Sequence, residues 1–560
     1  MKNLSVRRTA LSALLFVSAV SAVQAQAPSS AKIDSVVNKA VSNFDVPGVT
    51  LRIGTSIRTL QAQALTSSQI DSVVNKTLST FNVPGIAVGI VKDGKLIHAK
   101  GYGIRSIKGN EKVDEHTLFG IASNSKAFTA AALGILVDEH KITWDTKVND
   151  VIPDFKMYES YVTQEMTVRD LLTHRSGLGL GAGDLMIWPD SSTVTKPQLI
   201  HNLRYLKPTT SFRSQYDYDN LMFIVAGDIV TRVSGMPYED FVETRIMKPL
   251  GMTETADSWY RLKNKTNIID GHAPVGDKLV TVGLSFSEVG NAAGGIYSNI
   301  TDMSKWVIAQ INEGKFGDNL EKSLFSKAVH TEMWTPQTII KGGSPYNTHF
   351  SAYGLGWFLS DVNGYFQATH TGGLAGIVTQ VTILPELKLG IIVLTNQQSG
   401  AAFNSITNTI KDGYFGIKGK DRIKQYNDSR LAAEKKAKEI TDKVWADIAV
   451  QQKASKGKVA LAGVKGTYTD PWFGKVTISE KNGGLYYTSA NAPKLQGKMY
   501  FYKGNTFIVK WNERSLDADA FVTFTLDHDA KPVGYKLEAI SPLTDFSFDF
   551  QDLDFKRVND

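Results

Sequence analysis

Residues 118–126 of the chain are Leu-Phe-Gly-Ile-Ala-Ser-Asn-Ser-Lys, an apolar segment that ends with a serine and a lysine three positions apart. The apolar residues 118–122 predict a short buried strand, and the run Ala127–Glu139 is apolar at helical spacing. Ser123 and Lys126 therefore stand where a strand leads into a helix. Because residues i and i+3 share one face of a helix, the amine of Lys126 can reach the hydroxyl of Ser123.

A Ser-x-x-Lys pair is a weak signal by itself, since three occur in this chain, beginning at Ser29, Ser123 and Ser455. The structural context distinguishes Ser123 from the other two. A helix N-terminus directs free N–H groups and the positive end of a dipole toward its surroundings, which favours a developing oxyanion. A lysine that is partly desolvated there can act as a neutral base.

Three motifs follow one another along the chain: Ser123-Asn124-Ser125-Lys126, Tyr218-Asp219-Asn220 and His370-Thr371-Gly372-Gly373. As an ordered set they resemble the three motifs of the penicillin-recognising serine hydrolases, which include class C β-lactamases, DD-peptidases, D-aminopeptidases and related esterases. Supporting segments also resemble that family; they are residues 171–178, 248–252, 293–298, 353–357 and 394–396. The resemblance implies a β-lactamase/transpeptidase-like α/β (α+β) domain with an antiparallel sheet and a helical subdomain.

The resemblance also implies roles for the catalytic residues. Ser123 would be the acylated nucleophile, and Lys126 would lower the barrier to its deprotonation. Tyr218, hydrogen-bonded to the lysine, would serve as general base and then as acid to the leaving group. Taken singly, each of these residues is more often a packing or capping residue, so the expectation depends on the ordered set. His174, within a supporting segment, is expected to bond loop backbone behind the site.

The expected substrate-binding residues are Asn220, His370, Thr371, Gly372 and Gly373. Asn220 would orient Lys126 and the substrate amide, and the strand that bears His370 would form the far wall. The N–H groups of Ser123 and Gly373 would form an oxyanion hole. Many class C β-lactamases have lysine at the position of His370. A histidine is mostly neutral near pH 7, so this difference favours the peptidase side of the family over efficient β-lactam hydrolysis.

Composition excludes several other kinds of site. The chain has no Cys, and therefore no disulfide, thiol nucleophile or Cys-ligated metal. It has no Gly-x-Ser-x-Gly, His-Glu-x-x-His or Walker-type motif. We expect no metal and no cofactor.

Patterns along the chain predict the rest of the catalytic domain, residues 66–417. Residues 86–91 and 96–98 form a predicted hairpin around an Asp-Gly turn, and residues 391–394 read as a buried strand preceded by another at 380–384. Residues 220–233 are apolar at helical spacing and predict a second helix.

The C-terminal quarter has a different character. Residues 418–458 predict a charged linker helix, with a cap at Asp428 or Ser429 and an apolar stripe formed by Leu431, Ile440, Val444 and Ile448. Residues 459–560 predict a small β-barrel from alternating patterns, which include 507–511 and 546–550. This region resembles the lipocalin-like module often appended to the family. It could border the active-site mouth or pack elsewhere.

The N-terminus reads as a secretory signal peptide over residues 1–25, with Lys2, Arg7 and Arg8 before an apolar stretch too short to span a membrane. Residues 26–65 form a duplicated arm: residues 33–48 match residues 70–85 at 12 of 16 positions. We expect the second copy to belong to the fold and the first to be a spare helix and strand. The protein should be exported, periplasmic or secreted, and without stable membrane insertion.

The net charge of +7 does not indicate a nucleic-acid partner. The leader holds three basic residues and no acidic residue, and residues 418–458 hold 12 basic and 6 acidic residues. The remainder therefore carries a net charge of −2, so the excess basicity lies in a cleaved leader and one solvated helix.

The leading hypothesis is an exported serine hydrolase that acts on a small molecule or peptide through an acyl-enzyme on Ser123. D-amino-acid peptides or peptidoglycan-related substrates are favoured. A β-lactamase or carboxylesterase of the same family is an alternative, and a non-hydrolytic penicillin-binding or scaffolding protein is a second alternative. The sequence assigns no oligomeric state.

Overall fold

The central sheet is built from strands that are buried on both faces. Strand β1 (Gly85–Lys92) pairs with β14 (Leu389–Thr395), and all their residues except Lys92 are buried. Strands covered on both faces require continuous apolar runs, which is the pattern of residues 86–91 and 391–394.

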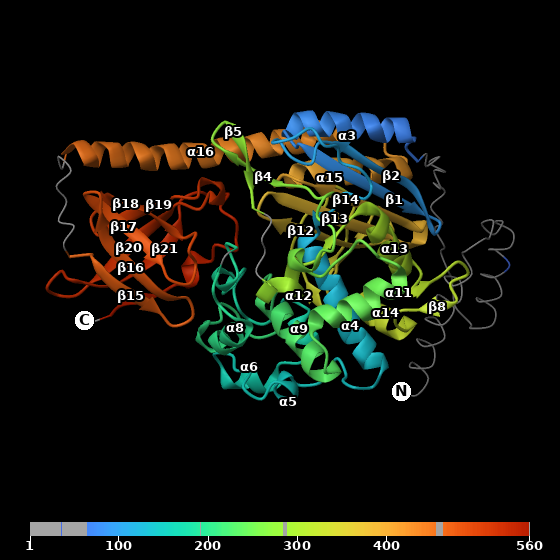
Figure 1. The fold of residues 1–560 in the computed structure, drawn as a ribbon, viewed down its shortest axis with the longest axis horizontal. Helices are drawn as coiled ribbons and strands as arrows, with labels where there is room; N and C mark the ends of the chain where they lie inside the picture. The colour runs from blue at the N-terminus through green and yellow to red at the C-terminus, as the bar shows by residue number, and fades with distance from the viewer. Residues whose placement is uncertain (1–34, 36–63, 191, 284–287, 455–462, 559–560) are drawn as a thin grey trace. The chain divides into compact units, whose positions relative to one another are not determined.

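The computed structural model, drawn as a ribbon in Figure 1, describes residues 35, 64–190, 192–283, 288–454 and 463–558.

Eight antiparallel strands form this sheet in the order β2-β1-β14-β13-β12-β11-β10-β9. The predicted hairpin is confirmed: β1 pairs with β2 across a turn in which Asp93 and Gly94 have φ of 51° and 76°. The predicted strands at 380–384 and 391–394 lie within β13 and β14. The other strand bounds are β2 (Lys95–Gly103), β13 (Ile377–Leu384), β12 (Tyr365–Leu374), β11 (Phe358–Val362), β10 (Ser351–Tyr353) and β9 (Thr338–Ile339).

Helices cover both faces of the sheet (Figure 1). Helices α3 (Ser67–Phe81) and α15 (Gly400–Tyr414) pack on one face, and α13 (Ile300–Ile311) packs on the other. Two glycines allow α13 to approach closely. A Cβ atom on Gly89 would lie 2.6 Å from Ile300 Cγ2, and one on Gly390 would lie 2.2 Å from Val307 Cγ1.

The helical subdomain is organised around α4 (Ser125–Asp138) and α9 (Leu221–Ser234), which pack against each other. Both helices were predicted, within two residues at each end. The smaller elements are α5 (Val148–Val151), α6 (Ser160–Glu165), α7 (Val168–Leu171), α8 (Lys196–Asn202), α10 (Tyr238–Val242), α11 (Lys248–Leu250), α12 (Asn291–Gly294), α14 (Lys327–Met333), β3 (Phe119–Gly120), β4 (Gly271–Val275), β5 (Lys278–Val282), β6 (Tyr297–Ser298), β7 (Lys315–Phe316) and β8 (Lys322–Ser323).

Helix α16 (Arg422–Ala454) follows α15 and runs along the barrel. Its predicted cap is wrong, because the helix begins at Arg422 and the side chain of Asp421 accepts from the N–H of Lys424. The predicted apolar stripe is only half correct. Val444 and Ile448 are buried in a cluster with barrel residues, whereas Leu431 and Ile440 are 48% and 39% exposed.

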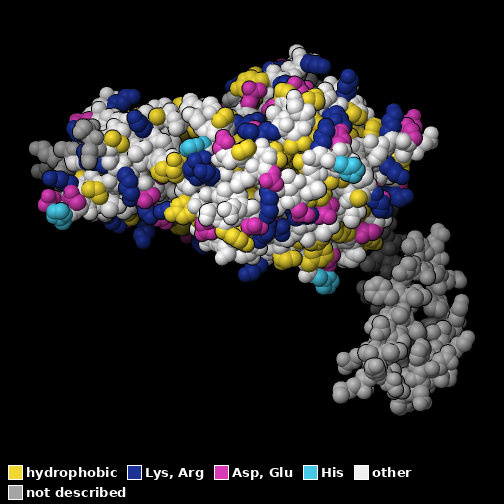
Figure 2. All heavy atoms as spheres, turned by 90° about the horizontal axis from the view of Figure 1, so that it is seen from below, with side chains coloured by type: hydrophobic (Ala, Val, Ile, Leu, Met, Phe, Trp, Pro, Cys, Tyr) yellow, Lys and Arg dark blue, Asp and Glu magenta, His cyan; other side chains and the backbone are white. Residues whose placement is uncertain are grey.

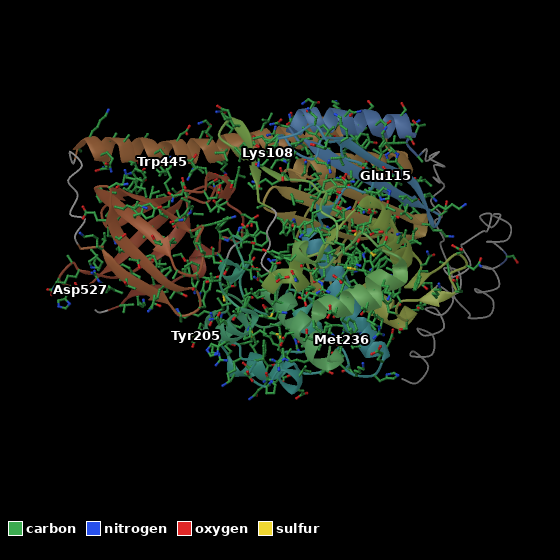
Figure 3. All side chains as sticks on the ribbon, viewed as in Figure 1. Lys108, Glu115, Tyr205, Met236, Trp445 and Asp527 are labelled. Atoms are coloured by element: carbon green, nitrogen blue, oxygen red, sulfur yellow. The ribbon has the colours of Figure 1, made fainter. Side chains whose placement is uncertain are left out.

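Trp445 extends the contact between α16 and the barrel (Figure 3), with its ring 5.5 Å from that of Tyr500 in an edge-on arrangement.

The C-terminal strands close into an eight-stranded antiparallel barrel, as the alternating patterns predicted. Buried aromatic side chains, among them Tyr468, Trp511 and Tyr535, fill its core. The strands are β15 (Gly466–Asp470), β16 (Gly474–Lys481), β17 (Gly484–Ser489), β18 (Gln496–Lys503), β19 (Thr506–Trp511), β20 (Ala520–Leu526), β21 (Pro532–Ala539) and β22 (Phe555–Arg557).

One predicted barrel strand is wrong. Residues 546–550 alternate in polarity, but they lie in the connection between β21 and β22, where no strand forms. Each phenylalanine of this segment makes its own contacts, as loop residues do. The phenylalanines do not alternate between the two faces of a sheet. We refer to residues 540–554 as the barrel loop.

The leader 1–25 and, apart from Ser35, the first copy of the duplication lie outside the described residues. The second copy forms most of α3 and the start of β1. In the described part of the chain, no helix combines the length and apolar character that a bilayer crossing requires. Figure 2 shows acidic and basic side chains intermingled on the face that it displays.

Candidate active site

Ser123 stands at a sharp turn between β3 and α4. Ala122 has a φ of 50°, a left-handed value that is unusual for a residue with a Cβ atom, and the 3₁₀ turn Ala122–Asn124 leads directly into α4. The side-chain amide nitrogen of Asn124 donates to the Ile121 carbonyl (3.0 Å) and to Thr379 Oγ1 (2.9 Å) on β13. These bonds attach the turn to the sheet and hold Ser123 at the edge of a pocket.

Lys126 lies fully buried behind Ser123, one helical turn along α4. Its Nζ makes three hydrogen bonds, to Ser123 Oγ (3.0 Å), Asn220 Oδ1 (2.7 Å) and the Ala293 carbonyl (2.8 Å). Burial lowers the pKa of Lys126 to about 7. The last two partners can only accept hydrogen bonds, so a neutral Lys126 would donate to both of them and accept from the hydroxyl of Ser123.

Tyr218 lies beside this pair, with its ring 4.8 Å from Lys126 Nζ. Its hydroxyl hydrogen-bonds to the Ser123 side chain, and burial strongly raises its pKa. The resemblance led us to expect a bond between Tyr218 and Lys126. The hydrogen bonds of Lys126 to described residues do not include one, and Tyr218 instead reaches the lysine through Ser123.

The segment that carries Tyr218 is held from behind by His174. The N–H of Asp219 donates to His174 Nδ1 (3.0 Å), and the imidazole packs on the ring of Tyr218 with centroids 4.2 Å apart. The predicted structural role of His174 is therefore confirmed. Ser176 adds a hydrogen bond to the carboxylate of Asp219 (3.1 Å).

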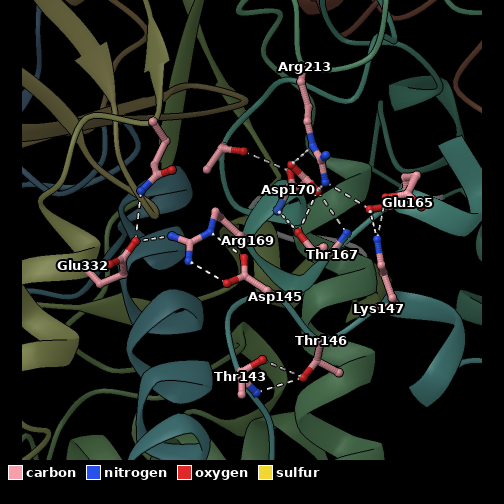
Figure 4. A network of polar contacts seen from close by, with 12 residues as sticks. Thr143, Asp145, Thr146, Lys147, Glu165, Thr167, Arg169, Asp170, Arg213 and Glu332 are labelled. Atoms are coloured by element: carbon pink, nitrogen blue, oxygen red, sulfur yellow. Dashed lines mark hydrogen bonds and ion pairs between the residues drawn. The ribbon is translucent and has the colours of Figure 1, made fainter.

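Asp170 connects the two loops that carry these residues. It is fully buried and binds Arg175 (3.0 Å), which directly follows His174, and Arg213 (2.6 Å), which precedes Tyr218 by five residues. Figure 4 shows Arg213 and Thr167 converging on its carboxylate. Burial alone would raise the pKa of Asp170, but the bonds to Arg213 and Thr167 hold it below its usual value.

Sequence reasoning missed Asp184, which lies next to the second motif in space. Its Oδ2 accepts from the amide nitrogen of Asn220 (2.8 Å), and burial raises its pKa to about 8. No motif marks this residue. It follows the glycine-rich segment 177–183, whose only sequence signal is a capacity for tight turns.

The third motif lies on β12, against the turn that carries Ser123. A Cβ atom on Gly372 would lie 2.2 Å from the Ile121 carbonyl oxygen and 2.9 Å from Ala122 Cβ, so glycine permits the close approach. A Cβ atom on Gly373 would meet nothing within 4 Å. Thr371 and Gly373 are exposed toward the pocket.

His370 lies in the pocket wall but is only 1% exposed, and protein partners occupy both ring nitrogens. Because a carbonyl only accepts, Nδ1 must donate to the Thr371 carbonyl (2.6 Å), and Nε2 then accepts from the hydroxyl of Tyr353 (2.8 Å). Burial lowers the pKa of His370 to about 3, so it stays neutral.

These residues surround a cavity of about 620 Å³. Six of the eight predicted site residues line it, while Lys126 and Gly372 lie behind its wall. The opposite wall comes from the barrel. The barrel residues in the lining are Lys494, Glu513, Ser515, Leu516, Asp517, Leu543, Asp545, Phe546, Ser547 and Phe548. Of the two sequence-based alternatives for the barrel, the structure supports a place at the active-site mouth.

The charged groups of this lining are mostly acidic. Lys494 is the one lysine or arginine among the described lining residues, and it is paired with Asp190 at 2.5 Å. Glu513, Asp517 and Asp545 also face the cavity. Within the described residues, no group of three or more His, Cys, Asp or Glu side chains is arranged to hold a metal ion.

Comparisons with known proteins agree with this architecture. A family model described as Beta-lactamase matches residues 70–412, and one described as a domain of unknown function (DUF3471) matches residues 451–557. Among solved structures, the chain resembles an octameric penicillin-binding protein homologue from Pyrococcus abyssi (TM-score 0.55, 20% identity, 88% of this chain and 100% of that chain). It also resembles a class C β-lactamase (TM-score 0.50, 20% identity, 63% and 96%). These similarities confirm the predicted fold class.

Curated relatives match the catalytic part. The chain is 30% identical over 325 residues to the unguisins hydrolase ungD′ of Aspergillus campestris (strain IBT 28561), covering 55% of this chain and 57% of the relative. It is 26% identical over 314 residues to Protein flp of Staphylococcus aureus (strain NCTC 8325 / PS 47), covering 55% and 59%. The chain thus spans somewhat more than half the length of these relatives.

Proposed function

The chain belongs to the Beta-lactamase family, and from that premise we propose that it is an exported serine hydrolase that forms an acyl-enzyme on Ser123 and cleaves amide or ester bonds. One observation carries the proposal: the fully buried amine of Lys126 lies 3.0 Å from the hydroxyl oxygen of Ser123. A serine is a weak nucleophile until a base takes its proton, and this contact places a base beside it.

The geometry supports separate roles for Lys126 and Tyr218 in acylation, the first as general base and the second as general acid. Neutral Lys126 takes the proton of Ser123 as Oγ attacks the substrate carbonyl, and the oxyanion forms near the N–H groups of Ser123 and Gly373. The raised pKa of Tyr218 keeps its phenol protonated, so Tyr218 suits proton donation to the leaving amine or alcohol, while Lys126 keeps the proton it took from Ser123. Water hydrolyses the ester of Ser123 by the reverse proton path.

We place the substrate among peptides with D-amino acids or peptidoglycan-related amides. Neutral, buried His370 offers no cation to a substrate carboxylate, and the carboxylates in the cavity wall favour a neutral or amine-bearing group. The name of the Aspergillus relative, unguisins hydrolase, also supports hydrolysis. β-Lactams usually present a carboxylate, so we expect their turnover to be slower.

A substrate panel tests this proposal with wild type and Ser123→Ala. The panel contains a D-amino-acid amide with a free amine, a D-Ala-D-Ala peptide, a chromogenic cephalosporin and a short acyl ester. We expect a mass increase at Ser123 and the fastest turnover with the amine-bearing amide. Full turnover by Ser123→Ala would refute the nucleophile assignment. A wild-type protein without adduct or turnover would indicate a non-hydrolytic binding protein.

Export is tested separately. We expect cleavage after Ala25, so the mature protein from cell fractions or medium should begin at Gln26. An N-terminal peptide that retains Lys2 in the mature protein would contradict it.

A further inference from the structure

The barrel loop leaves the barrel and makes three kinds of contact around the second motif. The ring of Phe546 meets that of Tyr218 edge-on, with centroids 5.7 Å apart. The hydroxyl of Ser547 donates to Asp184 Oδ2 (2.8 Å). The buried carboxylate of Asp549 accepts from the backbone N–H groups of Gly183 and Leu185, on either side of Asp184.

The hydrogen bond of Ser547 to Asp184 is the first of a chain of hydrogen bonds that ends at the nucleophile Ser123. Asp184 Oδ2 accepts from the amide nitrogen of Asn220 (2.8 Å), and Asn220 Oδ1 accepts from Lys126 Nζ (2.7 Å). Lys126 Nζ in turn lies 3.0 Å from Ser123 Oγ. Four hydrogen bonds therefore join a residue of the C-terminal module to the reacting hydroxyl.

Asp184 determines which end of the Asn220 amide faces the lysine. An asparagine side chain carries donors on nitrogen and an acceptor on oxygen. Because Asp184 Oδ2 accepts from that nitrogen, the oxygen is left to face Lys126. A reversed amide would place N–H groups against the amine of Lys126 and remove one of its acceptors.

Asp184 itself depends on the barrel for its position. It is fully buried, and its Oδ1 has no hydrogen-bond partner among the described residues. Its other oxygen is shared by Asn220 and Ser547. The bonds from Gly183 and Leu185 to Asp549 hold the backbone on both sides of it.

A glycine lets the barrel loop come this close. Gly181 has a φ of 71°, and a Cβ atom there would lie 2.6 Å from the carbonyl oxygen of Phe546. The N–H of Gly181 donates to the Tyr218 carbonyl (2.8 Å). The segment around Gly181 is thus held between the barrel loop and the second motif.

From these contacts we infer that Asp184 and Ser547 are positioning residues of the active site, through which the C-terminal barrel holds Asn220 and Lys126 in their reactive arrangement. The inference rests on the proposed acylation of Ser123. Neither residue touches the reacting atoms. Although Ser547 lines the cavity, its hydroxyl is bound to Asp184, so we expect its loss to change the rate of the chemical step and not substrate capture.

A fluorophosphonate reporter tests this on the full-length protein, because it labels a reactive serine without knowledge of the natural substrate. Labelling kinetics separate the limiting rate of adduct formation from the apparent binding constant. For Ser547→Ala we expect a limiting rate about tenfold lower with an unchanged binding constant. The matched control is Thr544→Val, which removes a hydroxyl of the same loop that bonds to the Asp517 carbonyl within the barrel. Its rate should equal that of wild type.

A double-variant cycle shows whether Ser547 acts through Asp184. In an Asp184→Ala background, the further change Ser547→Ala should alter the limiting rate by less than about twofold. The inference is overturned if Ser547→Ala labels like wild type, or if its effect is unchanged in that background. A wild-type protein that forms no adduct at Ser123 refutes the proposed function and this inference together, whereas equal labelling of wild type and Ser547→Ala refutes the inference alone.

Discussion

The open sheet and the closed barrel both consist of eight antiparallel strands, yet they contribute to the pocket in different ways. The sheet contributes residues of one strand, β12, to the pocket wall. His370, Thr371 and Gly373 are held there by the backbone hydrogen bonds between β12 and β13. The barrel fills its core with aromatic side chains and reaches the pocket through loops, including the one that carries Phe546 and Ser547. A ladder positions every residue along it, whereas each residue of a loop needs its own contact.

The largest effect is expected on the sheet-and-helix side, from Lys126→Ala. Removing the base beside Ser123 should slow adduct formation by about a thousandfold, the range of a general base. Fluorophosphonate labelling measures the rate, and circular dichroism verifies the fold. A rate within about tenfold of wild type would mean that another group deprotonates Ser123.

Two neighbouring glycines of β12 test how closely the strand must approach the serine turn. Gly372→Ala places a methyl against the Ile121 carbonyl and should lower the acylation rate about a hundredfold by moving Ser123. Gly373→Ala enters open space and keeps its N–H, so it should change the rate by about twofold or less. Equal effects of the two changes would show that the approach at Gly372 is unimportant.

The pH profile tests whether neutral Lys126 is the active form. Its pKa of about 7 means that the neutral fraction grows as pH rises, so the acylation rate should increase about tenfold between about pH 6 and pH 8. Asp184 also titrates nearby, with a pKa of about 8. Asp184→Asn removes a carboxylate that favours the charged ammonium, so the midpoint should move to lower pH. If the rise disappeared in Asp184→Asn, the titration would belong to Asp184.

The smallest effect is expected on the barrel side, from Phe546→Ala. This ring lies at the pocket rim and packs on Tyr218, so its loss should raise KM for a bulky amide about threefold, with little change in kcat. Phe521→Ala is the matched control, because that ring packs on Tyr502 beside α16. A change in KM from both variants would indicate general loosening of the barrel.

Much of the sheet side could be predicted because its signals are local. The apolar run 86–91 with its Asp-Gly turn predicted the β1–β2 hairpin, and the i, i+3 spacing predicted the contact of Ser123 with Lys126. The barrel side gave misleading local signals. Residues 546–550 alternate like a strand, but Phe546 and Phe548 meet Tyr218 and Trp188 of the catalytic domain, and Phe550 meets Trp511 of the barrel.

Asp184 shows why part of the site could not be predicted. Its neighbour in the site, Asn220, lies 36 positions away in the chain, and Ser547 lies 363 positions away. A single buried aspartate carries no periodicity and no motif, so only its burial and its partners identify it.

The sequence by itself determined the elements whose physics is local: the strands buried on both faces, the helices that follow Ser123 and Asn220, the barrel's alternation and the reach of Lys126 to Ser123. The tertiary structure alone decided what depends on long-range packing. It buried Lys126 and thereby lowered its pKa to about 7, and it brought Asp184 to Asn220 and the barrel loop to Asp184. Desolvation and hydrogen bonds between distant segments arise only when the chain is folded, because no spacing along the sequence specifies them.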